Sequence, residues 1–291
     1  MRFTPHVRRI AAVHDLSGIG RKSLMTVIPI LSTMGFNVCP LPTAILSNHS
    51  QYPEFSFLDL TEEMPRIINH WEKMDVSFEA IYTGYMGSPR QIEIVCGMIE
   101  RFRRPETLVV VDPVLGDNGH LYSKMSQEMV DEMRHLAVKA DVLTPNLTEA
   151  FALLGRPYKA ECSNDELKDI IAALSDMGPD TVIITGAPVP GQSGLTSVIA
   201  RSKSDLRTWK VTCPYLPAHY PGTGDSFTSV ITGSLLQGDS LPIALDRAAQ
   251  FILQGIRATF GYQTDSRDGI LLERVLPLLN MPIQSASYEL I

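Results

Sequence analysis

The sequence contains no long run of hydrophobic residues, and this argues against a membrane-spanning protein. No apolar stretch in its 291 residues approaches the roughly 20 residues that a helix needs to cross a bilayer. The first 13 residues carry basic side chains but only a short apolar run, too short for the core of a secretory signal. We therefore expect a cytoplasmic protein with no membrane partner.

Cysteine and positive charge are also scarce. The four cysteines, Cys39, Cys96, Cys162 and Cys213, lie far apart and form no metal-binding spacing, so we expect reduced thiols. The 25 lysines and arginines are outnumbered by 32 acidic residues, which gives a formal net charge of −7. This balance argues against a general nucleic-acid-binding protein and favours a small-molecule partner.

Short strand-like segments alternate with helical patterns through most of the chain. The strand-like segments are apolar and rich in β-branched residues, and they cover residues 8–13, 36–41, 79–84, 107–112, 141–145 and 181–186. The helical patterns cover residues 24–34, 88–102, 124–138, 147–154 and 165–177. This alternation predicts an α/β fold with a mainly parallel central sheet and helices on both faces, where ligands bind beyond the carboxyl ends of the strands.

The pattern changes after residue 186. Residues 195–200 and 207–213 read as antiparallel strands, and helices are predicted over 226–237 and 241–259. Residues 47–55 form a candidate loop over the site. Because no linker or repeat interrupts the chain, we expect a single domain over 1–291.

The segment PGTGDSFTSVITG, residues 221–233, places a carboxylate at the expected start of a helix. A helix N-terminus attracts anions, and the glycines Gly222 and Gly224 allow backbone N–H groups to approach one closely. Asp225 would repel a phosphate bound there. Its position alone leaves two interpretations open: Asp225 caps the helix, or it reacts.

The segment Gly222-Thr223-Gly224-Asp225 resembles the signature of the ribokinase-like kinases. That resemblance implies that Asp225 is the base that deprotonates an acceptor alcohol, while the first three residues form an anion hole for the transferred phosphate.

Four further segments are similar to those of vitamin B6 kinases. They are SNHSQY (47–52), YTGYMGS (82–88), VDPVLGDNG (111–119) and TPNLTEA (144–150), and the resemblance spans roughly residues 10–260 of the chain. It implies a kinase that uses ATP and Mg²⁺ to phosphorylate the 5′-hydroxymethyl group of pyridoxal, pyridoxamine or pyridoxine, and it suggests a homodimer.

The same resemblance assigns residues to the nucleotide and the metal. The implied nucleotide-binding residues are Asp112, Asp117, Asn146, Glu149, Thr185 and Gly186, of which Asp112 and Glu149 would serve magnesium. Without the resemblance, Asp112 is equally well a strand-end cap, Asn146 a helix cap and Glu149 a solvated acid in a first helical turn.

The acceptor side is assigned from two kinds of kinase. Tyr85 matches a tyrosine near the pyridine ring of B6 kinases, and Ser50 matches a residue that contacts the ring substituents; a core tyrosine and a turn serine are the structural alternatives. The turn VHDLSGIGRKSL (13–24), with Asp15 and Ser17, instead resembles that of hydroxymethylpyrimidine kinases. We expect a B6 vitamer as the acceptor, with hydroxymethylpyrimidine kinase and a non-catalytic vitamer-binding protein as the alternatives.

One glycine-containing segment is set aside. GIGRKS, residues 18–23, superficially resembles a P-loop, but Leu16 and Arg21 stand where that motif requires glycine. It also fails as a dinucleotide-binding fingerprint, because no acidic residue follows the next strand at the usual place.

Overall fold

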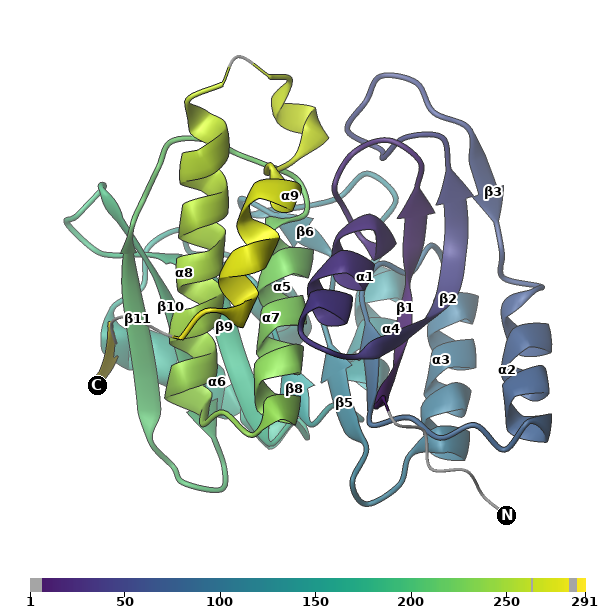
Figure 1. Cartoon of the computed structure of the whole chain (residues 1–291). Coiled ribbons are helices and arrows are strands. Elements are labelled where there is room, and N and C mark those ends of the chain that lie inside the picture. Colours follow the sequence, from purple (N-terminus) through teal and green to yellow (C-terminus); the bar gives the residue numbers. More distant parts are fainter. Residues whose placement is uncertain (1–6, 263, 283–286) are drawn as a thin grey trace.

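A twisted sheet of ten strands forms the middle layer of the computed structural model, which describes residues 7–262, 264–282 and 287–291 (Figure 1). Its order is β12-β11-β10-β9-β8-β5-β4-β1-β2-β3. The bounds are β1 Arg9–Ser17, β2 Asn37–Leu46, β3 Phe57–Asp59, β4 Ala80–Thr83, β5 Leu108–Val111, β8 Val142–Leu143, β9 Thr181–Pro188, β10 Leu195–Ser202, β11 Thr208–Pro214 and β12 Tyr288–Leu290. The run from β2 to β9 is parallel, and β10 is antiparallel to both β9 and β11, so the predicted mainly parallel sheet is confirmed.

Helices cover both faces of this sheet, as the sequence predicts. Their bounds are α1 Leu24–Thr33, α2 Met64–Lys73, α3 Pro89–Phe102, α4 Gln127–Ala137, α5 Leu147–Leu154, α6 Asn164–Asp176, α7 Thr223–Gln237, α8 Leu241–Phe260 and α9 Leu272–Val275, with short 3-10 helices η1 Ser266–Asp268 and η2 Leu276–Asn280. Helices α1, α7 and α8 lie on the near face in Figure 1, and α2 to α6 cover the other.

Strand β1 shows how the sequence produces two cores. Ile10 and Ala12 pack into the cluster with α1, α7 and α8, whereas Ala11 and Val13 pack into the cluster with α2 to α6. Side chains of a strand alternate between its faces, and all four of these residues are fully buried. A continuous apolar run is therefore what a strand covered on both faces requires.

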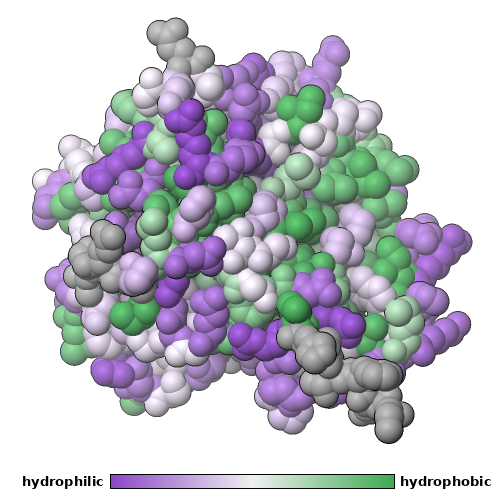
Figure 2. Space-filling model, in the orientation of Figure 1, coloured by the Kyte–Doolittle hydropathy of each residue, from purple (hydrophilic) through white to green (hydrophobic). Residues whose placement is uncertain are grey.

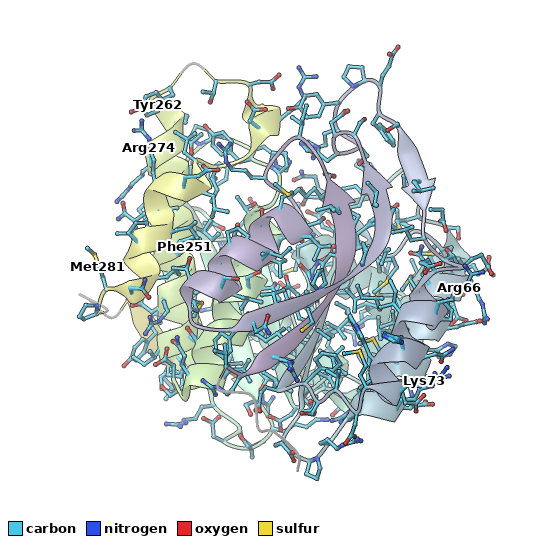
Figure 3. The ribbon with its side chains drawn as sticks, turned by 45° about the vertical axis from the view of Figure 1, so that its right-hand side comes forward. Arg66, Lys73, Phe251, Tyr262, Arg274 and Met281 are labelled. Carbon is cyan, nitrogen blue, oxygen red and sulfur yellow. The ribbon has the colours of Figure 1, made fainter. Side chains whose placement is uncertain are left out.

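The outer surface is mixed in character. Hydrophilic and hydrophobic residues are interspersed over the face in Figure 2. Arg66 and Lys73 of α2 point away from the molecule in Figure 3, whereas Met64 and Ile68 of the same helix are buried. No helix within the described ranges has both the length and the apolar character to cross a membrane.

Three features near the carboxyl ends of the strands differ from the sequence prediction. Strand β1 continues to Ser17, well past residue 13, and pairs with β2, which continues to Leu46. A hairpin of β6 (Gly116–Asp117) and β7 (His120–Leu121) was not predicted, although Asn118 and Gly119 have the positive φ angles, 52° and 80°, of an Asn-Gly hairpin turn. Helix α7 begins at Thr223 rather than at residue 226, which puts Asp225 inside its first turn.

Candidate active site

Two cavities lie next to each other at the carboxyl ends of the parallel strands. The first, of about 310 Å³, is called here the acidic cavity because its lining includes the carboxylates of Asp112, Asp117, Glu149 and Asp225. The second, of about 220 Å³, is called the aromatic cavity and is lined by Phe55, Phe57, Tyr85 and Tyr122 among others. Both cavities lie where ligands bind in open α/β sheets.

The structure gathers most of the expected site residues around these cavities. The acidic cavity is lined by Asp112, Asp117, Asn146, Glu149, Thr185, Gly186, Gly222, Thr223, Gly224 and Asp225. The aromatic cavity is lined by Asp15, Ser50 and Tyr85, and Tyr85 borders the acidic cavity as well. Ser17 is fully buried and lines neither of the two; its hydroxyl donates to Asp15 Oδ2 at 3.2 Å.

A third cavity adjoins the acidic one. It has a volume of about 210 Å³, and Thr185, Gly186, Thr223 and Gly224 contribute to both. Its other walls are mostly apolar and include Val198, Phe227, Ile252, Leu253 and Ile256. A flat apolar group joined to an anion fits such a pair of spaces.

Asp225 does not cap helix α7. The N-cap residue is Gly222, and no side chain caps this end of the helix. The carboxylate instead points inward, where its Oδ2 accepts a hydrogen bond of 3.0 Å from the backbone N–H of Ser23. The capping interpretation is therefore wrong.

The surroundings of Asp225 favour a carboxylate that can take up a proton. Burial raises its pKa above the usual value, although the charge of Lys22 and the bond from Ser23 lower it. Only 7% of the residue is exposed. A raised pKa moves the carboxylate toward the range in which it is an effective general base at neutral pH.

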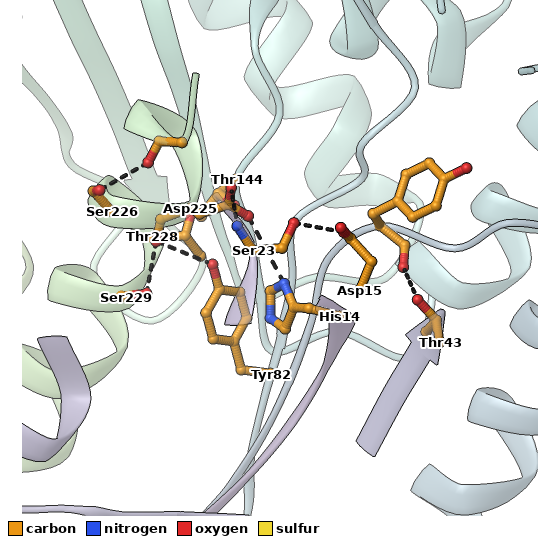
Figure 4. A network of polar contacts seen from close by, with 12 residues as sticks. His14, Asp15, Ser23, Thr43, Tyr82, Thr144, Asp225, Ser226, Thr228 and Ser229 are labelled. Atoms are coloured by element: carbon orange, nitrogen blue, oxygen red, sulfur yellow. Dashed lines mark hydrogen bonds and ion pairs between the residues drawn. The ribbon is translucent and has the colours of Figure 1, made fainter. Parts of the chain in front are cut away.

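His14 and Tyr82 lie directly beneath the carboxylate (Figure 4). His14 Nδ1 is 3.8 Å from Asp225 Oδ1, and the His14 ring packs edge-on against Tyr82 with centroids 4.4 Å apart. Full burial lowers the pKa of His14 to about 4, so this ring is neutral at pH 7. The Tyr82 hydroxyl donates to the backbone oxygen of Asp225 at 3.3 Å, which fixes the helix turn that carries the carboxylate.

Ser23 links the carboxylate to the aromatic cavity. Its backbone has a positive φ of 53°, an uncommon conformation for a residue other than glycine. Its hydroxyl donates to Asp15 Oδ1 at 2.5 Å while its N–H donates to Asp225. Asp15 thus orients the serine that holds Asp225.

The two glycines of the turn have different roles. Gly222 has a φ of 80°, and a Cβ there would lie 2.0 Å from the backbone oxygen of Arg21, so only glycine fits. A Cβ on Gly224 would meet nothing within 4 Å, because this residue borders the cavities. The turn packs against residues 21 and 22 on one side and opens to a ligand on the other.

Glu149 is both a helix cap and a buried acid. It forms a capping box with Asn146, whose N–H donates to Glu149 Oε2 at 2.8 Å, and the N–H of Leu115 donates to Oε1 at 3.1 Å. Burial nevertheless raises the pKa of Glu149 to about 8. The alternative of a solvated acid at this position is wrong, since only 4% of Glu149 is exposed.

Asp112 lies in the same acidic environment. Burial raises its pKa well above the usual value, and repulsion from Glu149 and Asp225 adds to that effect. Oxygen donors of this kind suit Mg²⁺. Within the described part of the chain no three His, Cys, Asp or Glu side chains form a metal-binding group, so a magnesium ion would need further ligands from water or a bound phosphate.

The loop over the aromatic cavity is tied to the C-terminal part of the chain. His49 Nε2 is 2.6 Å from the backbone oxygen of Arg267, and its Nδ1 accepts from the N–H of Gln51 at 3.3 Å. These two contacts place the ring proton on Nε2. The Tyr52 hydroxyl donates to Asp268 Oδ1 at 2.7 Å, so the loop forms a fixed wall.

Sequence reasoning missed several residues of the site. They are His14, Lys22, Ser23, His49, Gln51 and Tyr122. His49 and Gln51 lie in the segment 47–52, in which sequence reasoning assigned a role to Ser50 alone. Lys22 lies in the segment set aside as a failed P-loop. His14 and Ser23 act through contacts between residues far apart in sequence, which no local pattern reveals.

Comparison with known proteins identifies related kinases. The sequence model of the phosphomethylpyrimidine kinase family matches residues 61–268. A pyridoxal kinase of Arabidopsis thaliana is 31% identical over 252 residues, which cover 84% of this chain and 78% of that protein. A pyridoxine/pyridoxal/pyridoxamine kinase of Bordetella avium is also 31% identical, over 79% of this chain and 78% of its own.

Solved structures agree with these matches. A candidate phosphomethylpyrimidine kinase of Bacteroides thetaiotaomicron, crystallised in a form with pyridoxal, is 69% identical over 98% of this chain and 100% of its own, with a TM-score of 0.96. Pyridoxal kinase of Lactobacillus plantarum is 32% identical over 94% of this chain and 96% of its own, with a TM-score of 0.86. The expected ribokinase-like fold is confirmed.

The two glycines provide a matched test of the turn. We expect Gly222→Ala to lower the thermal stability of the ligand-free protein clearly, because the left-handed backbone alone costs about 1–3 kcal/mol and the Arg21 oxygen obstructs the new methyl group. Gly224→Ala should leave the melting temperature nearly unchanged. Equal melting temperatures for the two variants would contradict this description of the turn.

Proposed function

The chain belongs to the phosphomethylpyrimidine kinase family of ribokinase-like kinases, and from this premise we propose that it transfers the γ-phosphoryl group of ATP to the 5′-hydroxymethyl group of a B6 vitamer. The observation that carries this proposal is the position of Asp225. Its carboxylate is buried, is not used for capping, and lines the acidic cavity beside the aromatic one. The B6 acceptor is also supported by a relative at 69% identity whose crystal form contains pyridoxal.

The proposed reaction follows from the two cavities. The aromatic cavity holds the pyridine ring between aromatic side chains, with its hydroxymethyl group directed to Asp225. Asp225 removes the proton of that hydroxyl, and the oxygen forms a bond to the γ-phosphorus while the bond from that phosphorus to the β-γ bridging oxygen breaks. ADP then leaves with the bridging oxygen.

The donor side is assigned to the acidic cavity and its apolar neighbour. The phosphates lie against the N–H groups of Gly222, Thr223 and Gly224, which stabilise charge on the transferred group. Thr185 and Gly186, between the two spaces, are placed to contact the nucleotide. Asp117 and Asn146 complete the phosphate side of the lining.

Asp112 and Glu149 would hold magnesium. Their buried oxygens fit a hard divalent cation, and the ion would neutralise phosphate charge when bound. Coordination would offset the burial that raises the pKa of both carboxyl groups, and it would relieve the repulsion that Glu149 exerts on Asp112.

Hydroxymethylpyrimidine is the second candidate acceptor. The turn with Asp15 and Ser17 and the name of the matching family model favour it. We also propose that the protein is a homodimer, which the family resemblance supports. Sequence composition and patterning support a cytoplasmic location and a single domain over residues 1–291.

Substrate comparison tests the proposed function. Product formation from ATP should be measured with pyridoxal, pyridoxamine, pyridoxine and hydroxymethylpyrimidine. We expect a higher kcat/KM for at least one B6 vitamer, since a site that pairs the pyridine hydroxyl can discriminate by several powers of ten. The reverse ranking would move the assignment to hydroxymethylpyrimidine kinase, and vitamer binding without turnover would support a non-catalytic binding protein.

Asp225→Asn tests the base. The amide keeps the shape and can still accept from Ser23, but it cannot take a proton, so kcat should fall by about a hundredfold to ten-thousandfold. Nucleotide affinity should change little. The melting temperature should be equal or higher, because a buried charge is removed. Near-normal kcat in this variant would rule out Asp225 as the base.

Glu149→Gln tests the metal assignment against a matched control. Glu149 and Glu166 occupy the same position of two capping boxes, but Glu166 lies on α6 outside the cavities. Glu149→Gln should raise the Mg²⁺ concentration for half-maximal rate more than it changes the vitamer KM, and Glu166→Gln should not.

The Mg²⁺ concentration needed for half-maximal rate should depend on pH in a defined direction. Because Glu149 must lose its proton to bind the ion and burial raises its pKa to about 8, the wild-type Mg²⁺ requirement should fall as pH rises from 7 through 8. This dependence should weaken in Glu149→Gln. Identical magnesium titrations for wild type and both variants would overturn the assignment.

A further inference from the structure

Lys22 lies where the two main cavities meet. Five residues line both the acidic and the aromatic cavity: Lys22, Gln51, Tyr85, Val114 and Tyr122. Lys22 is the charged member of this set. A group passing from one cavity to the other must therefore pass close to its side chain.

The charge of Lys22 is not neutralised by an ion pair. Four carboxylates line the acidic cavity. Among the described residues that line it, Lys22 alone is a lysine or an arginine. Across the described residues, no carboxylate lies within 4.0 Å of its ammonium group in an ion pair. That group faces the Tyr122 ring at 6.0 Å from the centroid. Its field nevertheless reaches the base, since it lowers the pKa of Asp225.

The backbone around Lys22 is held firmly. On one side the N–H of Arg21 donates to the backbone oxygen of Asp268 at 3.1 Å. On the other, the N–H of Ser23 donates to Asp225 at 3.0 Å. A Cβ on Gly222 would lie 3.2 Å from the Cα of Lys22, so the lysine backbone packs directly against the anion-hole turn.

We propose that Lys22 is a further catalytic residue, whose ammonium group contacts the γ-phosphoryl group while it passes from the nucleotide to the hydroxymethyl oxygen. This proposal rests on the proposed function. The transferred group carries negative charge on three oxygens between the attacking and leaving oxygens. The anion hole donates N–H groups from α7, and Lys22 adds a full positive charge from the turn before α1.

The lysine does not act as a P-loop lysine. The segment around it lacks the glycines that would wrap a phosphate chain, and it follows the first strand on the acceptor side of the site. Its backbone instead supports Asp225 through Ser23. One short turn thus fixes both the base and the cation.

The test compares steady-state kinetics of purified full-length variants with MgATP and the best B6 vitamer. Lys22→Met should lower kcat by about a hundredfold to a thousandfold, the usual effect of losing one transition-state donor, while the KM values change much less. Lys22→Arg should recover a large part of kcat. Lys168→Met removes a lysine of α6 that pairs with Asp165 at 3.7 Å outside the cavities, and it should behave as wild type.

A second lysine separates catalysis from vitamer binding. Lys124 lines the aromatic cavity but not the acidic one, with its ammonium group 4.2 Å from the centroid of the Phe57 ring. Lys124→Met should act mainly on the vitamer KM. If Lys22→Met gives the same pattern, with kcat retained, Lys22 is a vitamer-binding residue and the proposal is overturned.

Chemical rescue excludes a merely structural effect. Added ethylammonium should stimulate Lys22→Ala and not wild type, because a small cation can occupy the space that the truncated side chain leaves. Melting temperatures establish that each variant is folded. No rescue of a folded, slow Lys22→Ala variant would contradict the proposal, whereas wild-type protein that phosphorylates no vitamer would instead contradict the proposed function.

Discussion

The hydrogen bond from the N–H of Ser23 to the carboxylate of Asp225 is the contact on which the rest of the site depends. It joins the turn after β1 to the first turn of α7, two segments about 200 residues apart in sequence. The contact turns Asp225 away from the helix end, which leaves the N–H groups of the glycine turn free for an anion. It also connects Asp225 to Asp15 through the serine hydroxyl. A carboxylate can therefore lie beside an anion hole without filling it.

The site contains several acidic residues, and burial favours the protonated forms of their carboxyl groups. Asp112, Glu149 and Asp225 all have raised pKa values, chiefly because burial disfavours their charged forms. Such a cluster is costly for the folded protein unless cations reduce the repulsion. The Mg²⁺ ion and the ammonium group of Lys22 supply that positive charge in the proposed reaction. The neutral His14 beneath Asp225 adds no charge of its own at pH 7.

The sequence predicted the parallel sheet, most helices and the four carboxylates of the acidic cavity, because those features have local signals. Apolar β-branched runs indicate covered strands, and Gly222 and Asn146 occupy helix ends that short motifs reveal. The rest depends on contacts distant in sequence. No local pattern reveals the contact of the His49 ring with the backbone oxygen of Arg267, or the hydrogen bond from the N–H of Ser23 to Asp225. The capping alternative for Asp225 was wrong for the same reason, since its carboxylate accepts from a donor in a distant part of the chain, the N–H of Ser23.

The central claim is that Asp225 faces the acceptor hydroxyl rather than the phosphate chain. A crystal structure of this protein with magnesium, a non-hydrolysable ATP analogue and pyridoxal tests it most directly. The claim predicts that the 5′-hydroxyl oxygen lies within about 3.2 Å of an Asp225 carboxylate oxygen and in line with the γ-phosphorus. A hydroxymethyl group directed away from Asp225, with both ligands bound, would contradict it.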